Sequence, residues 1–266
     1  MPGNVVAVSS GKGGVGKTSL TVNLAVALAG RGKKVLVCDA DLGLANVDIT
    51  LGLKPQYDLQ HVLAGERTLD EIVIEGPQGV GVIPAASGIA RMLELSAAER
   101  LEMGLAFTAL SERYDLVLLD TAAGIGQDVI SFLSGANHVI VVVCDEPTSL
   151  TDAYALIKVS ASERKVRRFQ IVANKVKGRA HGLQVYKKLL NATDQFLDVN
   201  LSYLGAVPTD HRMLESLRER TPVVSLYPRT QASVAIRDIA ASLEERFNLD
   251  FESDGFAALF QKNDMS

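Results

Sequence analysis

Residues 11–18 read GKGGVGKT, which satisfies the phosphate-loop pattern G-x-x-x-x-G-K-[ST]. Glycines in such a loop allow backbone N–H groups to turn toward phosphate oxygens, and the helix that follows adds partial positive charge. Lys17 is then expected to reach the β- and γ-phosphates, and the hydroxyl of Thr18 to ligate Mg²⁺. The spacing therefore predicts a site for a nucleoside triphosphate with Mg²⁺, whereas the alternative is a tight glycine-rich turn that binds no ligand.

Three aspartates are candidates to complete the magnesium site. Asp120 ends the apolar run LVLLD, and Asp39 and Asp41 end a second run, VLVCDAD. Ligands of open α/β sheets bind at the carboxyl ends of the strands, and Mg²⁺ is held by carboxylates together with water. We therefore expect all three beside the phosphate loop. The alternative for each is a surface aspartate that caps a turn.

The elements that must position these residues follow from the hydrophobic pattern. Continuous apolar runs, which are typical of strands buried on both faces of a parallel sheet, occur at 5–8, 34–38, 80–84, 115–120, 138–144, 169–174 and 204–208. Helical patterns lie between them at 17–30, 96–112, 149–163, 182–194, 211–220 and 231–246. This alternation predicts an α/β fold with a single doubly wound, mostly parallel sheet flanked by helices. We expect one domain over residues 1–247 and a C-terminal tail over residues 248–266.

The composition limits the class of protein. Of 266 residues, 47% are apolar, and 27 basic residues stand against 31 acidic ones for a formal net charge of −4. This balance gives no general attraction to nucleic acid or to anionic lipid. Cys38 and Cys144 each end an apolar run, so we expect buried thiols in a reducing cytoplasm instead of a disulfide framework. No apolar run is long enough to span a membrane.

Several strings resemble one family. KGGVGKT, with its first lysine at Lys12, resembles the deviant Walker A motif of the MinD/ParA group of P-loop ATPases. Residues 38–48 (CDADLGLANVD) resemble its switch I, and residues 118–126 (LLDTAAGIG) its Walker B motif and switch II. With PAASG at 84–88 and CDEPTSLTDAYALIK at 144–158, the chain looks most like the branch of flagellar-number regulators called FlhG or FleN. The resemblance implies a SIMIBI-type P-loop NTPase fold and a slow, partner-stimulated ATPase.

The resemblance also implies roles for individual residues. In the family, two subunits sandwich two ATP molecules, and the first lysine crosses to the phosphates bound by the partner; Lys12 matches it and has no evident role within its own subunit. Catalysis is therefore expected from Lys12, Lys17 and Asp41, and Mg²⁺ binding from Thr18, Asp39 and Asp120. The expected ATP-binding residues are Gly11, Lys12, Gly13, Gly14, Val15, Gly16, Lys17, Thr18, Ser19, Asn174 and Pro208, the last two lining the adenine.

The base is expected to be adenine. The string NKVKG at 174–178 begins like the guanine motif N-K-x-D, but Lys177 stands where that motif has aspartate. The implied cofactors are therefore ATP and Mg²⁺.

The resemblance implies a switch whose ATP-bound state orders residues 41–48 and 121–128 and dimerises, and which hydrolysis resets to the monomer. The implied function of the switch is to regulate the number or placement of flagella. The implied partners are a second copy of the chain, an FlhF-type GTPase, flagellar switch proteins or a flagellar transcription regulator. A cytoplasmic location with peripheral contact at the inner face of the cell membrane follows. The alternative is a ParA- or MinD-type ATPase that positions DNA or the division site.

Two surface segments leave alternatives open. Phe256, Leu259 and Phe260 fall on one helical face of the tail, which predicts either a short membrane-binding helix or a segment packed on the domain. The basic cluster ERKVRR at 163–168, with Lys175, Lys177 and Arg179, reads as a solvated helix end, and we expect no DNA partner. An iron–sulfur carrier is disfavoured because the two cysteines are far apart in sequence. A P-loop biosynthetic enzyme with a small-molecule acceptor is disfavoured because no acceptor motif is evident.

Overall fold

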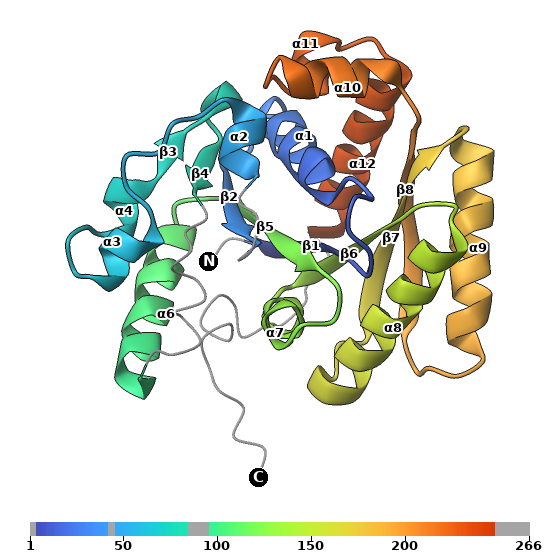
Figure 1. Ribbon diagram of the computed structural model, residues 1–266, viewed down its shortest axis with the longest axis horizontal. Coiled ribbons are helices and arrows are strands. Elements are labelled where there is room, and N and C mark those ends of the chain that lie inside the picture. Colours follow the sequence, from blue (N-terminus) through green and yellow to red (C-terminus); the bar gives the residue numbers. More distant parts are fainter. Residues whose placement is uncertain (1–3, 42–45, 85–95, 248–266) are drawn as a thin grey trace.

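The computed structural model describes residues 4–41, 46–84 and 96–247. In this part of the chain, eight strands form one sheet in the order β3-β4-β2-β5-β1-β6-β7-β8 (Figure 1). Seven of them run parallel, and β3 pairs antiparallel with β4 at one edge. Their bounds are β1 (Asn4–Ser10), β2 (Val35–Ala40), β3 (Ile74–Glu75), β4 (Gly81–Ile83), β5 (Leu116–Ala123), β6 (His138–Val143), β7 (Arg168–Val176) and β8 (Asn200–Pro208). The predicted doubly wound sheet is confirmed.

Helices cover both faces of the sheet (Figure 1). One layer contains α1 (Lys17–Ala29), α2 (Val47–Leu51), α11 (Val223–Leu226) and α12 (Gln231–Phe247), with α10 (His211–Arg218) beside α11. The opposite layer contains α3 (Leu59–Leu63), α4 (Leu69–Ile72), α6 (Ala97–Ser111), α7 (Gln127–Ser134), α8 (Pro147–Arg164) and α9 (Arg179–Asp194). Each layer forms its own apolar core against the sheet.

The central strands are apolar on both faces because both faces are covered. Every residue of β2 and β6 is buried, as are the first six of β5. The predicted burial of Cys38 and Cys144 is confirmed, since each thiol residue is 4% exposed. The polar residues of β2 and β5 lie toward the carboxyl ends of these strands, where Asp39 and Asp120 are directly opposite each other.

The short elements escaped the sequence pattern. Helices α2, α3, α4 and α11 have five residues or fewer, so they never complete the periodicity that identifies an amphipathic helix. Helices α3 and α4 instead begin with capping boxes, at Asp58 and Thr68 respectively. The eight-residue helix α7 was also missed, although it carries three buried aliphatic residues. Among the described residues, no helix has the length and apolar character required to cross a membrane.

Candidate nucleotide and magnesium site

The phosphate loop joins the end of β1 to the start of α1, as predicted, and two of its glycines are dictated by sterics. Gly16 has a φ of 96°, a left-handed conformation, and a β-carbon there would lie 2.5 Å from Nδ2 of Asn174. Gly11 fits against α8, where an added β-carbon would lie 2.1 Å from the backbone carbonyl carbon of Asp152. The loop is therefore held tightly between β7 and α8.

Strand β7 fixes the outer curve of the loop through two consecutive residues. The side-chain amide Nδ2 of Asn174 donates to the carbonyl oxygen of Val15 at 2.7 Å, and the ammonium of Lys175 donates to the carbonyl oxygen of Gly14 at 2.7 Å. Lys175 adopts a φ of 55°, which lysine rarely occupies. Lys175 was not among the predicted site residues, and its left-handed backbone could not be read from the sequence.

The two predicted adenine-lining residues lie at neighbouring strand ends. Asn174 belongs to β7, and Pro208 ends β8, where it pairs with Val176. The structure thus brings both to the carboxyl edge of the sheet, beside the phosphate loop. Their contact with the base stays a prediction.

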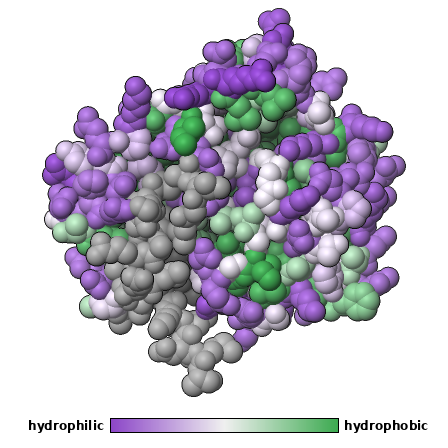
Figure 2. Space-filling model, viewed as in Figure 1, coloured by the Kyte–Doolittle hydropathy of each residue, from purple (hydrophilic) through white to green (hydrophobic). Residues whose placement is uncertain are grey.

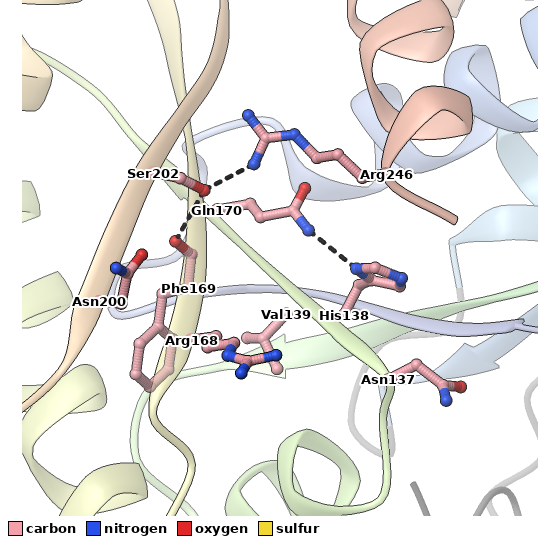
Figure 3. Close-up of a pocket in the computed structure, with 9 residues that line it drawn as sticks. All are labelled: Asn137, His138, Val139, Arg168, Phe169, Gln170, Asn200, Ser202 and Arg246. Atoms are coloured by element: carbon pink, nitrogen blue, oxygen red, sulfur yellow. Dashed lines mark hydrogen bonds between the residues drawn. The ribbon is translucent and has the colours of Figure 1, made fainter. Parts of the chain in front are cut away.

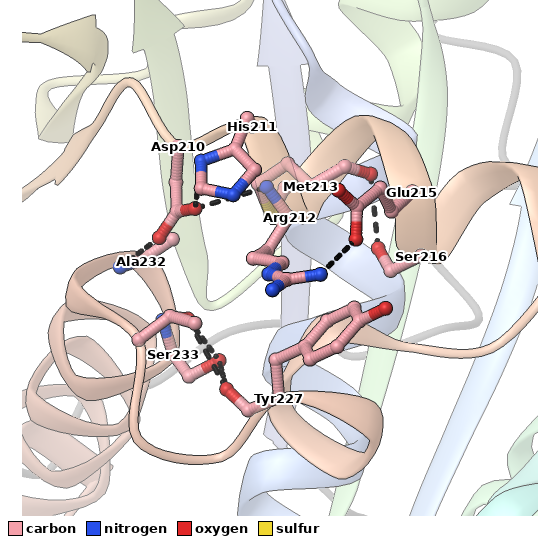
Figure 4. A network of polar contacts seen from close by, with 10 residues as sticks. Asp210, His211, Arg212, Met213, Glu215, Ser216, Tyr227, Ala232 and Ser233 are labelled. Carbon is pink, nitrogen blue, oxygen red and sulfur yellow. Dashed lines mark hydrogen bonds and ion pairs between the residues drawn. The ribbon is translucent and has the colours of Figure 1, made fainter.

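A polar network fixes the chain just beyond Pro208 (Figure 4). Asp210 caps α10 by accepting from the backbone N–H of Arg212 at 3.0 Å, and its second oxygen accepts from the N–H of Ala232 on α12 at 3.3 Å. The guanidinium of Arg212 pairs with Glu215 and lies over the ring of Tyr227, 4.6 Å from its centroid. The chain that follows Pro208 is therefore anchored to α10, α11 and α12.

The predicted magnesium residues Thr18 and Asp120 meet directly. The hydroxyl of Thr18 donates to Oδ2 of Asp120 at 2.6 Å, and the hydroxyl of Thr21, one turn later on α1, donates to Oδ1 at 3.0 Å. Burial raises the pKa of Asp120 to about 7, reinforced by the charge of Asp39, while the bonds from both threonines and the charge of Lys17 act in the opposite direction. Thr21 was not predicted, although its i+3 spacing from Thr18 puts both hydroxyls on one helical face.

The side chain of Asp39 binds backbone N–H groups on both sides of the loop that follows β2. Its carboxylate accepts from the N–H groups of Asp41 at 3.1 Å, Asn46 at 2.9 Å and Val47 at 3.1 Å. Burial raises the pKa of Asp39, and these three bonds oppose the shift. Asp39 therefore ties the end of β2 to the start of α2, across residues 42–45, which lie outside the described residues. Its predicted place near the Mg²⁺ shell, like the water-orienting role of Asp41, stays a prediction.

The donor set suits Mg²⁺. The Thr18 hydroxyl and the Asp120 carboxylate are hard oxygen ligands already in contact, and a buried carboxylate with a raised pKa gains from a nearby cation. Within the described ranges, no three histidine, cysteine, aspartate or glutamate side chains group around a common metal position. The site thus matches the usual magnesium pattern, in which one or two protein ligands act together with substrate phosphates and water.

Lys12 was expected to have no role within its own subunit, but it has contacts there. Its ammonium lies 2.7 Å from Oε2 of Glu146 and donates to the hydroxyl of Thr148 at 2.9 Å. Both partners belong to the start of α8, and the Lys12 and Glu146 side chains are substantially exposed, at 38% and 56%. The hydrogen bond to Glu146 raises the pKa of Lys12, and the same bond lowers the pKa of Glu146. The sequence did not indicate Glu146 as a partner, because it lies 134 positions after Lys12.

Other predicted features fall outside or at the margin of the site. Phe256, Leu259 and Phe260 lie outside the described residues. The basic cluster at 163–168 spans the end of α8 and the start of β7, as expected for a helix end, with Lys165 in a left-handed capping conformation.

Known proteins resemble this chain along most of its length. Residues 3–171 match the family described as AAA domain. The chain is 44% identical to the antiactivator FleN of Pseudomonas aeruginosa, over 91% of this chain and 87% of that relative. It is 34% identical to the flagellum site-determining protein YlxH of Helicobacter pylori, over 97% of this chain and 88% of that relative.

A solved structure shows the same architecture. The septum site-determining protein MinD of Pyrococcus horikoshii, in complex with Mg-ADP, superposes with a TM-score of 0.73 at 26% identity, covering 92% of this chain and 98% of that chain. The fold of this chain is thus similar to that of MinD.

Proposed function

The chain belongs to the MinD/ParA-like family of P-loop ATPases, and from this premise we propose that it is an ATP-dependent dimerisation switch that regulates the number or placement of flagella. As a member of this family it is an ATPase. The observation that supports the switch is the position of Lys12 in the phosphate loop, where it forms an exposed ion pair with Glu146. The observation that carries the cargo is the similarity to FleN and YlxH.

The residues divide the work of hydrolysis between binding and charge stabilisation. The loop amides and Lys17 hold the β- and γ-phosphates, and Asp41 orients the water that attacks the γ-phosphorus. Thr18 and Asp120 would hold Mg²⁺, which would neutralise phosphate charge. Lys12 of the partner subunit meets the charge that develops on the γ-phosphoryl group, in the manner of an arginine finger. The bond from the γ-phosphorus to the bridging oxygen breaks, and ADP and phosphate leave.

Lys12 therefore has two alternative positions, one on Glu146 of its own subunit and one at the phosphates held by the partner subunit. In the described chain the ammonium is bound to Glu146 and Thr148, so it must leave them before it reaches a neighbouring subunit. An exposed ion pair is readily exchanged because solvent screens it. Two ATP phosphate tails across a dimer interface offer a much denser negative charge. We therefore expect the monomer to hold Lys12 in place and the ATP-bound dimer to recruit it.

Exposed aliphatic residues support an interface on the same side of the molecule. Ile49 on α2 is 55% exposed and Ile125, just before α7, is 50% exposed. Figure 2 shows apolar surface over α2 and around α7 on the face that also carries the phosphate loop. Ile49 is the first residue after the switch I segment 41–48, and Ile125 lies within the switch II segment 121–128. Ordering of these segments by the γ-phosphate would place two aliphatic residues against a second copy.

The cargo is assigned through the relatives. We propose that the dimer acts on an FlhF-type GTPase, flagellar switch proteins or a flagellar transcription regulator, from a cytoplasmic location with peripheral contact at the inner face of the membrane. A slow basal ATPase that such a partner stimulates follows from this role. The second candidate is a MinD- or ParA-type ATPase that positions the division site or DNA; the similarity to MinD favours it on fold alone.

Sedimentation velocity with Mg²⁺ and a non-hydrolysable ATP analogue tests the switch. The wild-type chain should shift from monomer to dimer, and Lys12→Gln should stay monomeric while it still binds the analogue. Lys158→Gln, which removes an exposed lysine on α8, is the matched control and should dimerise normally. A monomeric wild-type chain at saturating analogue would contradict the switch. For the cargo, a deletion strain should show altered flagellar counts, whereas altered chromosome or septum placement would support the second candidate.

A further inference from the structure

A cavity lies at the amino-terminal ends of the strands, at the end of the sheet opposite the phosphate loop (Figure 3). Its volume is about 310 Å³, and its walls are formed by the first residues of β6, β7 and β8 and by the last turn of α12. The lining residues are Asn137, His138, Val139, Arg168, Phe169, Gln170, Asn200, Ser202 and Arg246. Ligand pockets generally begin at about 300 Å³, so the space suits a small metabolite.

Strand alternation explains why polar groups converge here. Along the face of β7 that meets α12, Arg168 and Gln170 precede the core residue Val172. The same change from polar to aliphatic occurs on β6, from His138 to Ile140. Strands β6 and β7 pair side by side, so these positions share one surface. The amino-terminal ends of the strands thus supply polar side chains where the rest of this face supplies core.

One buried polar atom in the cavity is left without a partner. Gln170 is 8% exposed, and its amide Nε2 lies 3.0 Å from Nδ1 of His138. Its carbonyl oxygen Oε1 is buried and has no hydrogen-bond partner. A buried oxygen of this kind loses its hydration without compensation unless a donor is supplied. A ligand with a hydroxyl or amino group would supply that donor.

The charge of the cavity favours an anion. Arg246 is oriented by Ser202, whose hydroxyl accepts from Nη1 at 2.7 Å, and by the carbonyl oxygen of Tyr203, which accepts from Nη2 at 3.1 Å. A guanidinium has five N–H donors, so these two bonds leave others for a ligand. Arg168 is a second basic residue of the lining, and no carboxylate is among the lining residues that the structure describes. Burial and the charge of Arg246 lower the pKa of His138 to about 4, so its ring is neutral at physiological pH.

We propose that this cavity binds a small organic anion that also carries a hydroxyl group, with the anionic group at the arginines and the hydroxyl at Oε1 of Gln170. The site is separate from the nucleotide site, because the two lie at opposite ends of β6 and β7. Phosphate monoesters and carboxylates share the required chemistry. The inference does not depend on the flagellar role.

Nuclear magnetic resonance of the histidine rings tests the proposal on the full chain. The phosphate loop is first saturated with Mg-ADP, so that an added phosphate ester cannot bind there. Ribose 5-phosphate, malate and uncharged ribose are then titrated to about 10 mM, a concentration that detects weak millimolar binding. The ring signal of His138, identified by its loss in His138→Gln, should shift and saturate with ribose 5-phosphate or with malate. Whichever acid binds more tightly identifies the anionic group as phosphate or carboxylate.

A matched pair of arginine variants distinguishes the cavity from non-specific binding. Arg168→Gln should weaken binding of the acid by about tenfold or more, as expected for loss of a charged contact. Arg167→Gln removes the neighbouring arginine, which does not line the cavity, and should leave the affinity unchanged. Both variants should bind Mg-ADP normally. The proposal is wrong if neither acid shifts the His138 signal, if ribose shifts it equally, or if the two variants weaken binding to the same extent.

Discussion

The ammonium of Lys12 lies 2.7 Å from the carboxylate of Glu146, so the lysine proposed to act on a second subunit is bound to α8 of its own. The contact joins the phosphate loop to the segment that follows β6, and it is open to solvent. We propose that this contact is the resting position of Lys12 in the monomer. Replacement of either end should shift the balance between the two positions in opposite directions.

Glu146→Gln should favour the dimer. The substitution removes the negative charge that holds Lys12 in its own subunit but keeps a side chain of the same shape. We expect the dimer dissociation constant with Mg-ATP analogue to fall by about two- to tenfold, since exposed ion pairs contribute modestly. Sedimentation equilibrium measures it. Glu112→Gln, which changes an exposed carboxylate at the end of α6, is the control; equal effects of the two variants would rule out the resting position.

Lys175 should hold the phosphate loop in its binding shape. Its ammonium bonds the carbonyl oxygen of Gly14, and its backbone is in a left-handed conformation that costs about 1 kcal/mol for a residue with a β-carbon. Lys175→Met should therefore weaken ATP affinity by about three- to tenfold, as loss of a charged hydrogen bond would.

A glycine at the same position separates the ammonium from the backbone. Lys175→Gly should relieve the strain and raise thermal stability above that of Lys175→Met, yet it should bind ATP equally weakly. Lys177→Met, a nearby exposed lysine, should bind like the wild type. Fluorescent-nucleotide titration gives the affinities, and wild-type affinity in Lys175→Gly would show that the ammonium has no role.

Proton release should accompany magnesium-nucleotide binding. The pKa of Asp120 is raised from 3.8 to about 7 in the folded chain, so between these values the folded chain binds more protons than the unfolded chain. This carboxyl therefore lowers the free energy of unfolding as the pH rises through that window. A cation at Asp120 favours the ionised form, so Mg-ADP should displace a fraction of a proton at pH 7 and less at about pH 8.5.

Calorimetry in buffers of different ionisation enthalpy measures the released protons. Asp120→Asn, which cannot ionise, is the control and should release fewer protons at pH 7. If the wild type and Asp120→Asn release the same number, Asp120 does not ionise on binding.

Two loop glycines should respond differently to alanine. Gly11→Ala would drive a β-carbon into the backbone of α8, so we expect a loss of about 1–3 kcal/mol of stability and a loss of nucleotide binding. Gly13→Ala meets no atom within 4 Å and should fold like the wild type. Thermal unfolding with and without Mg-ADP compares them. Equal melting temperatures would show that the loop does not depend on close contact with α8.

The sequence predicted the parts of this molecule that depend on local pattern. Buried strands, long helices, the phosphate loop and the meeting of Thr18 with Asp120 follow from apolar runs and motif spacing. The partner of Lys12 could not be predicted, because Glu146 is 134 positions away and only the β1–β6 pairing brings it close. The hydrogen bond from Lys175 to Gly14 depends on a left-handed backbone. The cavity at the amino-terminal ends of the strands depends on the register of β6, β7 and β8 and on the position of the end of α12. These are properties of tertiary packing that no local pattern encodes.

The most direct test of the account is a structure of Asp41→Ala, the variant that we expect to block hydrolysis, bound to Mg-ATP. The account predicts a two-fold dimer in which the ammonium of Lys12 has left Glu146 and contacts the phosphates held by the partner subunit. A chain that binds Mg-ATP with Lys12 still on Glu146 and Thr148 of its own subunit would contradict it.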